Sequence, residues 1–251
     1  SSDQTICSGM PANLTLTGYT GTITKWQSST TAAFTTPVDI AASASATLTS
    51  VQMGAITATT YYRAVVTNGG CTGYSNVVTI TVSTSTWNGS VWSNGVPSLT
   101  KAAIFAGNYS STGDLSACSV TVQSGTVVFN TNHTLTVQNA VTVTGGSLTF
   151  EDDSSLLQIS NAVNSGNITY KRTTTPIRKF DFTYWSSPVA PQTLVALSPL
   201  TQFDKYFTFD PVIGNWVTVA SSSLMVAGKG YIIRGPNNFD PVVAAPYNAS
   251  F

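Results

Sequence analysis

Residues able to do acid–base chemistry are scarce in this chain. The single histidine is His133, within Asn130-Thr-Asn-His-Thr134, and the single glutamate is Glu151. A Ser-His-Asp mechanism would have to use His133, yet no serine lies in the glycine pattern of a nucleophile elbow. We therefore interpret His133 as part of a polar surface turn. No His/Cys cluster is present, which excludes a zinc site, and we expect no cofactor and no enzymatic activity.

The only acidic cluster is Glu151 with Asp152 and Asp153. Glycoside hydrolysis needs two carboxyl groups on either side of one bond. Adjacent residues of a strand point to opposite faces, so this cluster would need Asp114 or Asp181 to complete such a pair. We interpret the cluster as a solvated turn. Asp152 and Asp153 are also a calcium candidate, because hard cations bind carboxylate and carbonyl oxygens.

Three cysteines are present, and two of them, Cys7 and Cys71, fall within one predicted domain. In an oxidising compartment we expect these two to form a disulfide. By loop-closure entropy such a bridge contributes roughly 4 kcal/mol. We expect Cys118 to be a small, buried and inert side chain.

Aromatic residues are the remaining candidates for ligand contact. Trp87 and Trp92 lie five apart in a stretch with two Asn-Gly turns that ends at Pro97. They could form a sugar-stacking platform, but we favour a plug over an open end of the predicted solenoid described below. Alternating aromatics in strands usually face a neighbouring sheet. The candidate glycan contacts are Trp92, Trp185, Trp216 and Tyr231.

A repeat near the middle must organise these residues in space. Each unit has a β-branched strand, a glycine turn and a second strand ending in an aromatic, in Val120–Phe129, Val141–Phe150 and Val163–Tyr170. The glycines of these turns are Gly125, Gly146 and Gly166, so the steps are 146 − 125 = 21 and 166 − 146 = 20 residues. This period predicts a short β-solenoid, whose rungs bury a core only by stacking. A third strand per rung is predicted at Thr134–Val137 and Leu156–Ile159.

Two further units flank the repeat in a chain that we expect to be all-β. Residues 1–84 predict an immunoglobulin-like β-sandwich, with Trp26 as the core tryptophan and Ala64 where antibody domains carry a cysteine. Residues 85–172 form the solenoid with its N-terminal cap, after a linker at Ser83–Thr86. Residues 173–251 predict an aromatic-rich, β-sandwich-like unit. Its last residues lack a closing turn, so we expect that unit to be truncated.

Composition excludes several classes of function. Charged residues are 8% of the chain and the formal net charge is zero, which argues against a nucleic-acid partner. No stretch of about 18 apolar residues occurs, so we expect no membrane insertion. The chain opens at Ser1 without a signal peptide, which predicts a mature or excised piece.

Several segments resemble one group of proteins. Three look like the immunoglobulin-like repeats of very large secreted proteins of Bacteroidetes: Thr5–Gly9, Thr59–Val66 and Ser75–Val82. Four are similar to the region that often follows those repeats: Trp87–Pro97, Ala106–Tyr109, Tyr184–Val189 and Gly228–Arg234. The resemblance implies export by the type IX secretion system, an extracellular or cell-surface location, and adhesin-like roles such as gliding motility. The C-terminal sorting domain usual in such proteins is not seen.

Together these observations predict a non-enzymatic structural and adhesive fragment of a large secreted surface protein. Its partners would be surface glycans or other cell-surface proteins, and by resemblance the type IX export machinery. One alternative is a carbohydrate-binding accessory region of a secreted polysaccharide-degrading enzyme. A second is a solenoid hydrolase of the polysaccharide-lyase kind, for which the rungs and acidic residues are too few.

Overall fold

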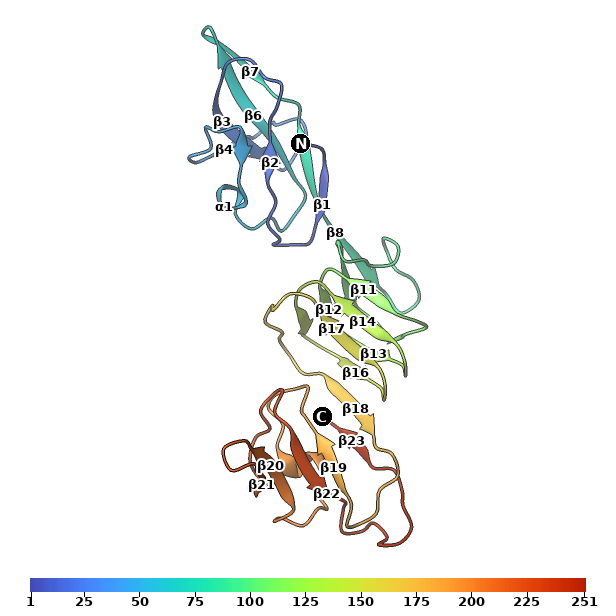
Figure 1. Ribbon diagram of the computed structural model, residues 1–251. Helices are drawn as coiled ribbons and strands as arrows, with labels where there is room; N and C mark the ends of the chain where they lie inside the picture. Colours follow the sequence, from blue (N-terminus) through green and yellow to red (C-terminus); the bar gives the residue numbers. More distant parts are fainter.

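The computed structural model covers all 251 residues. They form three β units in a row (Figure 1). The first unit contains the N-terminus, the solenoid lies in the middle, and the C-terminus lies where the solenoid meets the third unit. The only helices are single turns, α1 (Ser50–Met53) and α2 (Leu194–Leu197). Neither has the length or the hydropathy that crossing a membrane requires. The predicted all-β class with a solenoid is confirmed.

The first unit is an immunoglobulin-like sandwich. Its larger sheet has the order β4-β3-β6-β8, with β1 parallel to β8 and β7 beside β6, and its smaller sheet is β2-β5. Trp26 lies opposite Ala64 in this larger sheet, and both side chains are buried. The strands are β1 (Gln4–Ile6), β2 (Leu14–Thr15), β3 (Thr22–Ser29), β4 (Val38–Ile40), β5 (Thr47–Leu48), β6 (Thr60–Asn68), β7 (Cys71–Tyr74) and β8 (Val78–Trp87).

The solenoid stacks about four turns through three parallel sheets. The first sheet joins β8 to β9 (Lys101–Phe105), β12 (Val120–Val122) and β15 (Val141–Val143). The second contains β10 (Tyr109–Ser110), β13 (Thr126–Phe129), β16 (Ser147–Phe150) and β18 (Thr169–Thr173). The third contains β11 (Leu115–Ala117), β14 (Thr134–Val137) and β17 (Ser155–Gln158). The third strand per rung is therefore confirmed.

A column of rings fills the solenoid interior. Phe129 stacks on Phe150 with ring centroids 5.4 Å apart, and Phe150 stacks on Tyr170 at 4.7 Å. These are the aromatics that end the second strand of each repeat unit. Alternation directs them inward, and the parallel register then places each ring over the next.

The third unit packs its sheet against the end of the solenoid. The antiparallel sheet order is β19-β22-β20-β21, and β23 pairs with β18 so that the C-terminal strand joins the solenoid. One hydrophobic core of 22 buried residues runs through both units, and it includes Phe105 in the first solenoid turn and Tyr206 in the third unit. The strands are β19 (Phe182–Trp185), β20 (Tyr206–Asp210), β21 (Asn215–Thr218), β22 (Tyr231–Arg234) and β23 (Asn248–Ser250).

The junction between the first unit and the solenoid differs from the prediction. Ser83–Thr86 is not a linker but part of β8, which pairs with β6 and β1 through Val78–Val82 and with β9 through Ser83–Trp87. The two units therefore share a strand, and their sheets are continuous.

The predicted Cys7–Cys71 disulfide is wrong, because Cys7 is bonded to Cys118 across this junction. The parallel pairing of β1 with β8 brings Cys7 to the solenoid side of the first unit. There its Cα lies 5.4 Å from that of Cys118, a spacing usual for disulfides. Cys71 follows the β6–β7 turn and stays a free, exposed thiol. Cys118 is buried as expected, but as half of the disulfide.

Candidate functional site

His133 serves the structure of a turn. Its Nδ1 lies 2.7 Å from Ser111 Oγ, and the same oxygen accepts a hydrogen bond from the backbone N–H of Asn130 at 2.8 Å. Ser111 belongs to one solenoid turn, and Asn130 and His133 belong to the next. Ser111 is only 2% exposed, which closes its hydroxyl to a substrate. This contact between histidine and serine joins adjacent rungs.

The acidic residues also have structural partners. Glu151 forms an ion pair with Lys171 at 2.7 Å, and Asp152 accepts a hydrogen bond from the backbone N–H of Thr173. Asp153 occupies the turn between β16 and β17 with φ 59°. No three His, Cys, Asp or Glu side chains converge as metal ligands. The calcium site at Asp152 and Asp153 stays a prediction.

The other two carboxylates considered for a catalytic pair each accept a hydrogen bond from a backbone N–H. Asp114 accepts from the N–H of Thr134, and Asp181 accepts from the N–H of Arg178. The Asp181 interaction fixes a local turn, as short acidic side chains commonly do, and the Asp114 interaction joins adjacent rungs of the solenoid.

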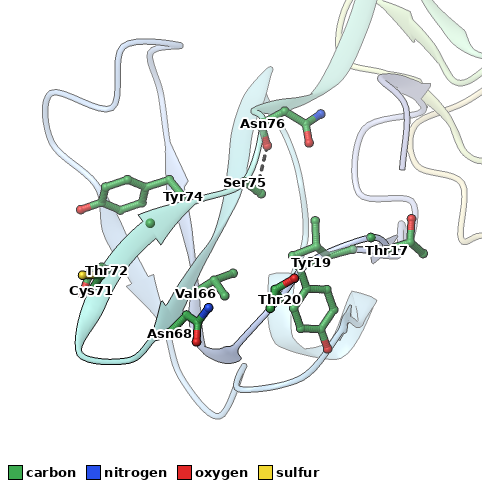
Figure 2. Close-up of a pocket in the computed structure, with 13 residues that line it drawn as sticks. Thr17, Tyr19, Thr20, Val66, Asn68, Cys71, Thr72, Tyr74, Ser75 and Asn76 are labelled. Carbon is green, nitrogen blue, oxygen red and sulfur yellow. Dashed lines mark hydrogen bonds between the residues drawn. The ribbon is translucent and has the colours of Figure 1, made fainter.

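The free thiol lies in a pocket of about 470 Å³ on the first unit. Figure 2 shows Cys71 on β7 at one side of this pocket and Tyr19 across from it, with Asn68 between them. No histidine, carboxylate, lysine or arginine lines the pocket. Nothing there supplies the base or cation that activates a cysteine nucleophile.

Trp87 and Trp92 cover the first turn of the solenoid, the position that the plug interpretation predicts. Their ring centroids are 5.5 Å apart, and Trp92 lies 5.3 Å from buried Phe105. Trp87 donates its indole N–H to the carbonyl of Asn108 at 2.7 Å. Both indoles are half-buried, so packing on the core uses much of their surface.

Two other glycan candidates also pack inward. Tyr231 is 2% exposed and its hydroxyl accepts from the N–H of Val226, so it cannot stack on a sugar. Trp185 is half-buried, and its ring lies 5.7 Å from that of Phe251. Alternation explains both cases, since Tyr231 and Trp185 face each other across β22 and β19 on the core side of the sheet.

Trp216 differs because it lies on the opposite side of the same sheet. Its ring centroid is 6.0 Å from that of Tyr184 and 5.6 Å from that of Phe209. On the same side, Phe182 lies 5.8 Å from Phe207. We call this surface the aromatic face, and its members are Phe182, Tyr184, Phe207, Phe209, Trp216 and Ile232.

The register of the paired strands shows which side chains belong to the aromatic face. Tyr184 lies opposite Ile232, and Ile232 lies opposite Phe207. Their sequence neighbours Tyr206 and Ile233 are buried in the core. Tyr184 is 75% exposed and Phe209 is 47% exposed. The sequence candidates missed all members of this face except Trp216.

Two protein-family models match the chain. Residues 79–251 match Domain of unknown function (DUF8693), and residues 1–84 match Domain of unknown function (DUF8696). The chain belongs to the DUF8693 family. That match begins within β8 and covers the solenoid and the third unit, the two parts that share one core. No curated protein and no solved structure matches the chain.

Proposed function

We propose that this chain is a non-enzymatic structural and adhesive region of a large secreted cell-surface protein. In this role the solenoid is a stiff spacer that holds a binding surface away from the first unit. Stiffness requires that the joints between units resist bending, because inter-domain motion is the default where few contacts cross a linker.

The observation that carries the proposal is the continuity of β8. Its first half is hydrogen-bonded within the immunoglobulin-like sheet and its second half within the solenoid. β8 passes from one sheet into the other without an intervening loop, so the joint contains no flexible linker. The Cys7–Cys118 disulfide adds a covalent cross-link beside the strand. At the other end, the shared core fixes the third unit to the solenoid.

An extracellular location is part of the proposal. A structural disulfide persists in oxidising environments, and the bond lies at the joint where the proposed role needs rigidity. Export by the type IX secretion system and a role in gliding motility remain proposals that rest on the sequence resemblance.

A distance measurement between spin labels tests this stiffness. The native Cys71 is free and exposed, and Val242→Cys supplies a second label site on the third unit, where Val242 is 75% exposed. We expect one narrow distance distribution. The flexible reference has a four-glycine insertion between Val82 and Ser83 together with Cys7→Ser and Cys118→Ser. A distribution in the otherwise native chain as broad as that of this reference would refute the stiff spacer.

The second candidate function is the carbohydrate-binding accessory region of a secreted polysaccharide-degrading enzyme. One observation favours it, namely the aromatic face, because exposed contiguous apolar patches mark interaction sites. In both candidate functions a surface at the far end of the chain makes the contact.

A further inference from the structure

We infer that the aromatic face of the third unit binds a neutral polysaccharide by stacking on its pyranose rings. The inference rests on the contact-making part of the proposed function and names the surface and the class of ligand. It is carried by the six side chains of the aromatic face on β19, β20, β21 and β22.

The rings of the aromatic face form a platform of tilted rings, with interplanar angles of 57° between Trp216 and Tyr184 and 72° between Trp216 and Phe209. Trp216 contacts Tyr184 on one side and Phe209 on the other, at 6.0 Å and 5.6 Å between ring centroids. All three project from paired strands of a rigid sheet. Trp216 is half-buried between its two neighbours, so this ring has less side-chain freedom to lose on binding than an isolated exposed ring would have.

The chemistry of the platform suits the C–H groups of a sugar ring. Aromatic rings have a negative face that attracts the weakly positive C–H groups lining one side of a pyranose. Tyr184 and Thr218 add hydroxyl groups beside the rings, and neither hydroxyl has a hydrogen-bond partner within the chain. Apolar surface with a few polar groups is the usual lining of a small-molecule site.

Charge favours a neutral ligand. None of the six side chains of the aromatic face is charged. Arg234 lies opposite Phe182 on the same side of the sheet, but it is only 9% exposed and its Nη2 donates to Gln202 and Asn237. An acidic polysaccharide or an anionic membrane surface would find no accessible cation among these side chains.

The size of the aromatic face argues against a stable protein interface. A standard interface takes about 20–30 residues from each partner and carries a polar rim enriched in arginine. The aromatic face has only six side chains and none with an accessible charge, so it is smaller and less polar than such an interface. A chain of sugar rings needs only a few aromatic contacts in a row.

Depletion binding assays on the full chain test the inference, with cellulose, chitin, β-1,3-glucan and starch granules as insoluble probes. We expect binding to at least one probe. Tyr184→Ala should weaken it about thirtyfold, which is ~2 kcal/mol, as for an aromatic at the centre of an interface. Tyr184 is 75% exposed, so this variant should fold normally. Trp216→Ala should weaken the same binding.

Two matched controls separate stacking from other effects. Tyr184→Phe keeps the ring and should keep most of the binding. Tyr19→Ala removes an exposed tyrosine of the first unit, 41% exposed in the native chain, and should change nothing. An equal loss with Tyr19→Ala would place the site on the first unit and overturn the inference.

Several results would overturn the aromatic face as a polysaccharide site. These are no binding to any of the four probes, or binding unaffected by both Tyr184→Ala and Trp216→Ala. Tyr184-dependent binding to phosphatidylcholine vesicles, or Tyr184-dependent dimerisation in sedimentation, would show a different occupant. The spin-label distances use other residues, so failure here leaves the stiff spacer standing.

Discussion

Gly146 provides the sharpest test of how closely the solenoid turns approach each other. Its φ is +74°, and a Cβ built on it would lie 2.2 Å from the carbonyl oxygen of Gly125. A Cβ built on Gly125 would likewise lie 2.5 Å from the carbonyl carbon of Gly107. Glycines therefore follow one corner of the solenoid from turn to turn, and no side chain fits between their backbones.

The effect of Gly146→Ala follows from two costs. An L-residue in the left-handed region costs about 1–2 kcal/mol. Real Cβ atoms do not approach closer than 3.0 Å, so the contact is short by 3.0 − 2.2 = 0.8 Å, and the obstacle is backbone. Relief requires the adjacent turns to separate beside the Thr126–Ser147 pair. With overpacking at about 1–3 kcal/mol, we expect a loss of about 2–5 kcal/mol in the free energy of unfolding.

Gly228→Ala is the matched control. Its φ of +77° is nearly the same, but no atom lies within 4 Å of the added Cβ. The control should therefore lose only about 1–2 kcal/mol. The difference between the two variants isolates the contact between turns.

Urea unfolding followed by circular dichroism and tryptophan fluorescence measures both variants. The solenoid and the third unit share one core, so we expect a common transition for them. Equal losses for Gly146→Ala and Gly228→Ala, within about 0.5 kcal/mol, would refute the close packing of the turns at this corner.

Two further predictions concern the disulfide and the buried tyrosines. The Cys7–Cys118 bond closes a separation of 111 residues, so Cys7→Ser should lower the free energy of unfolding by up to roughly 5 kcal/mol on the loop-entropy model. Cys71→Ser should have no such effect. A larger loss of thermal stability for Cys71→Ser than for Cys7→Ser would contradict the Cys7–Cys118 pairing. Burial raises the pKa of Tyr109 above its usual value, so the folded chain holds that proton more tightly than the unfolded chain does. The protonated Tyr109 therefore stabilises the folded chain. This contribution is complete below about pH 10 and is lost as pH rises through the folded-state pKa of Tyr109. Denaturant titrations at several alkaline pH values should show that the free energy of unfolding falls less with rising pH in Tyr109→Phe than in the native chain. An equal fall in both chains would contradict the effect.

Local, periodic features were predictable from the sequence. The spacing of Gly125, Gly146 and Gly166 predicts the rungs. Gly125 and Gly146 reverse the chain at one corner, whereas Gly166 lies over Val143 and not over Gly146. Positive φ at all three explains why glycine is used there. The rings of Phe129, Phe150 and Tyr170 follow from the same spacing. Periodicity therefore predicted the solenoid and its interior.

The junction was not predictable, since it depends on pairing between distant segments. Ser83–Thr86 has the composition of a linker, and only its pairing with β9 makes it a strand. Likewise, Cys7 reaches Cys118 because β1 runs parallel to β8. Assigning cysteines to domains by sequence position favoured Cys71, which lies beside the β6–β7 turn.

The candidate ligand residues show a third limit. Alternation in Phe182–Trp185 shows that Tyr184 and Trp185 point to opposite faces, but it does not say which face is covered. A shift of one residue in the strand register would exchange all side chains of the covered face with those of the exposed face. The preference for tryptophan selected Trp185, which packs on Phe251, and missed Tyr184, which is exposed.

The exposure of the aromatic face follows from the architecture of the third unit. A β-sheet needs another layer on each apolar face, and this unit has a single four-stranded sheet. The end of the solenoid, with β18 and β23, covers one face through Tyr206, Tyr231 and Ile233. The other face contains exposed Tyr184 and Phe209, and no element of the chain covers them. A sheet that served only as a cap would need polar residues on that outer side, as half-solvated antiparallel sheets have. Cross-strand pairs such as Phe209 with Trp216 add to the stability of the sheet, and the exposed ring of Tyr184 leaves apolar surface that an external ligand would cover.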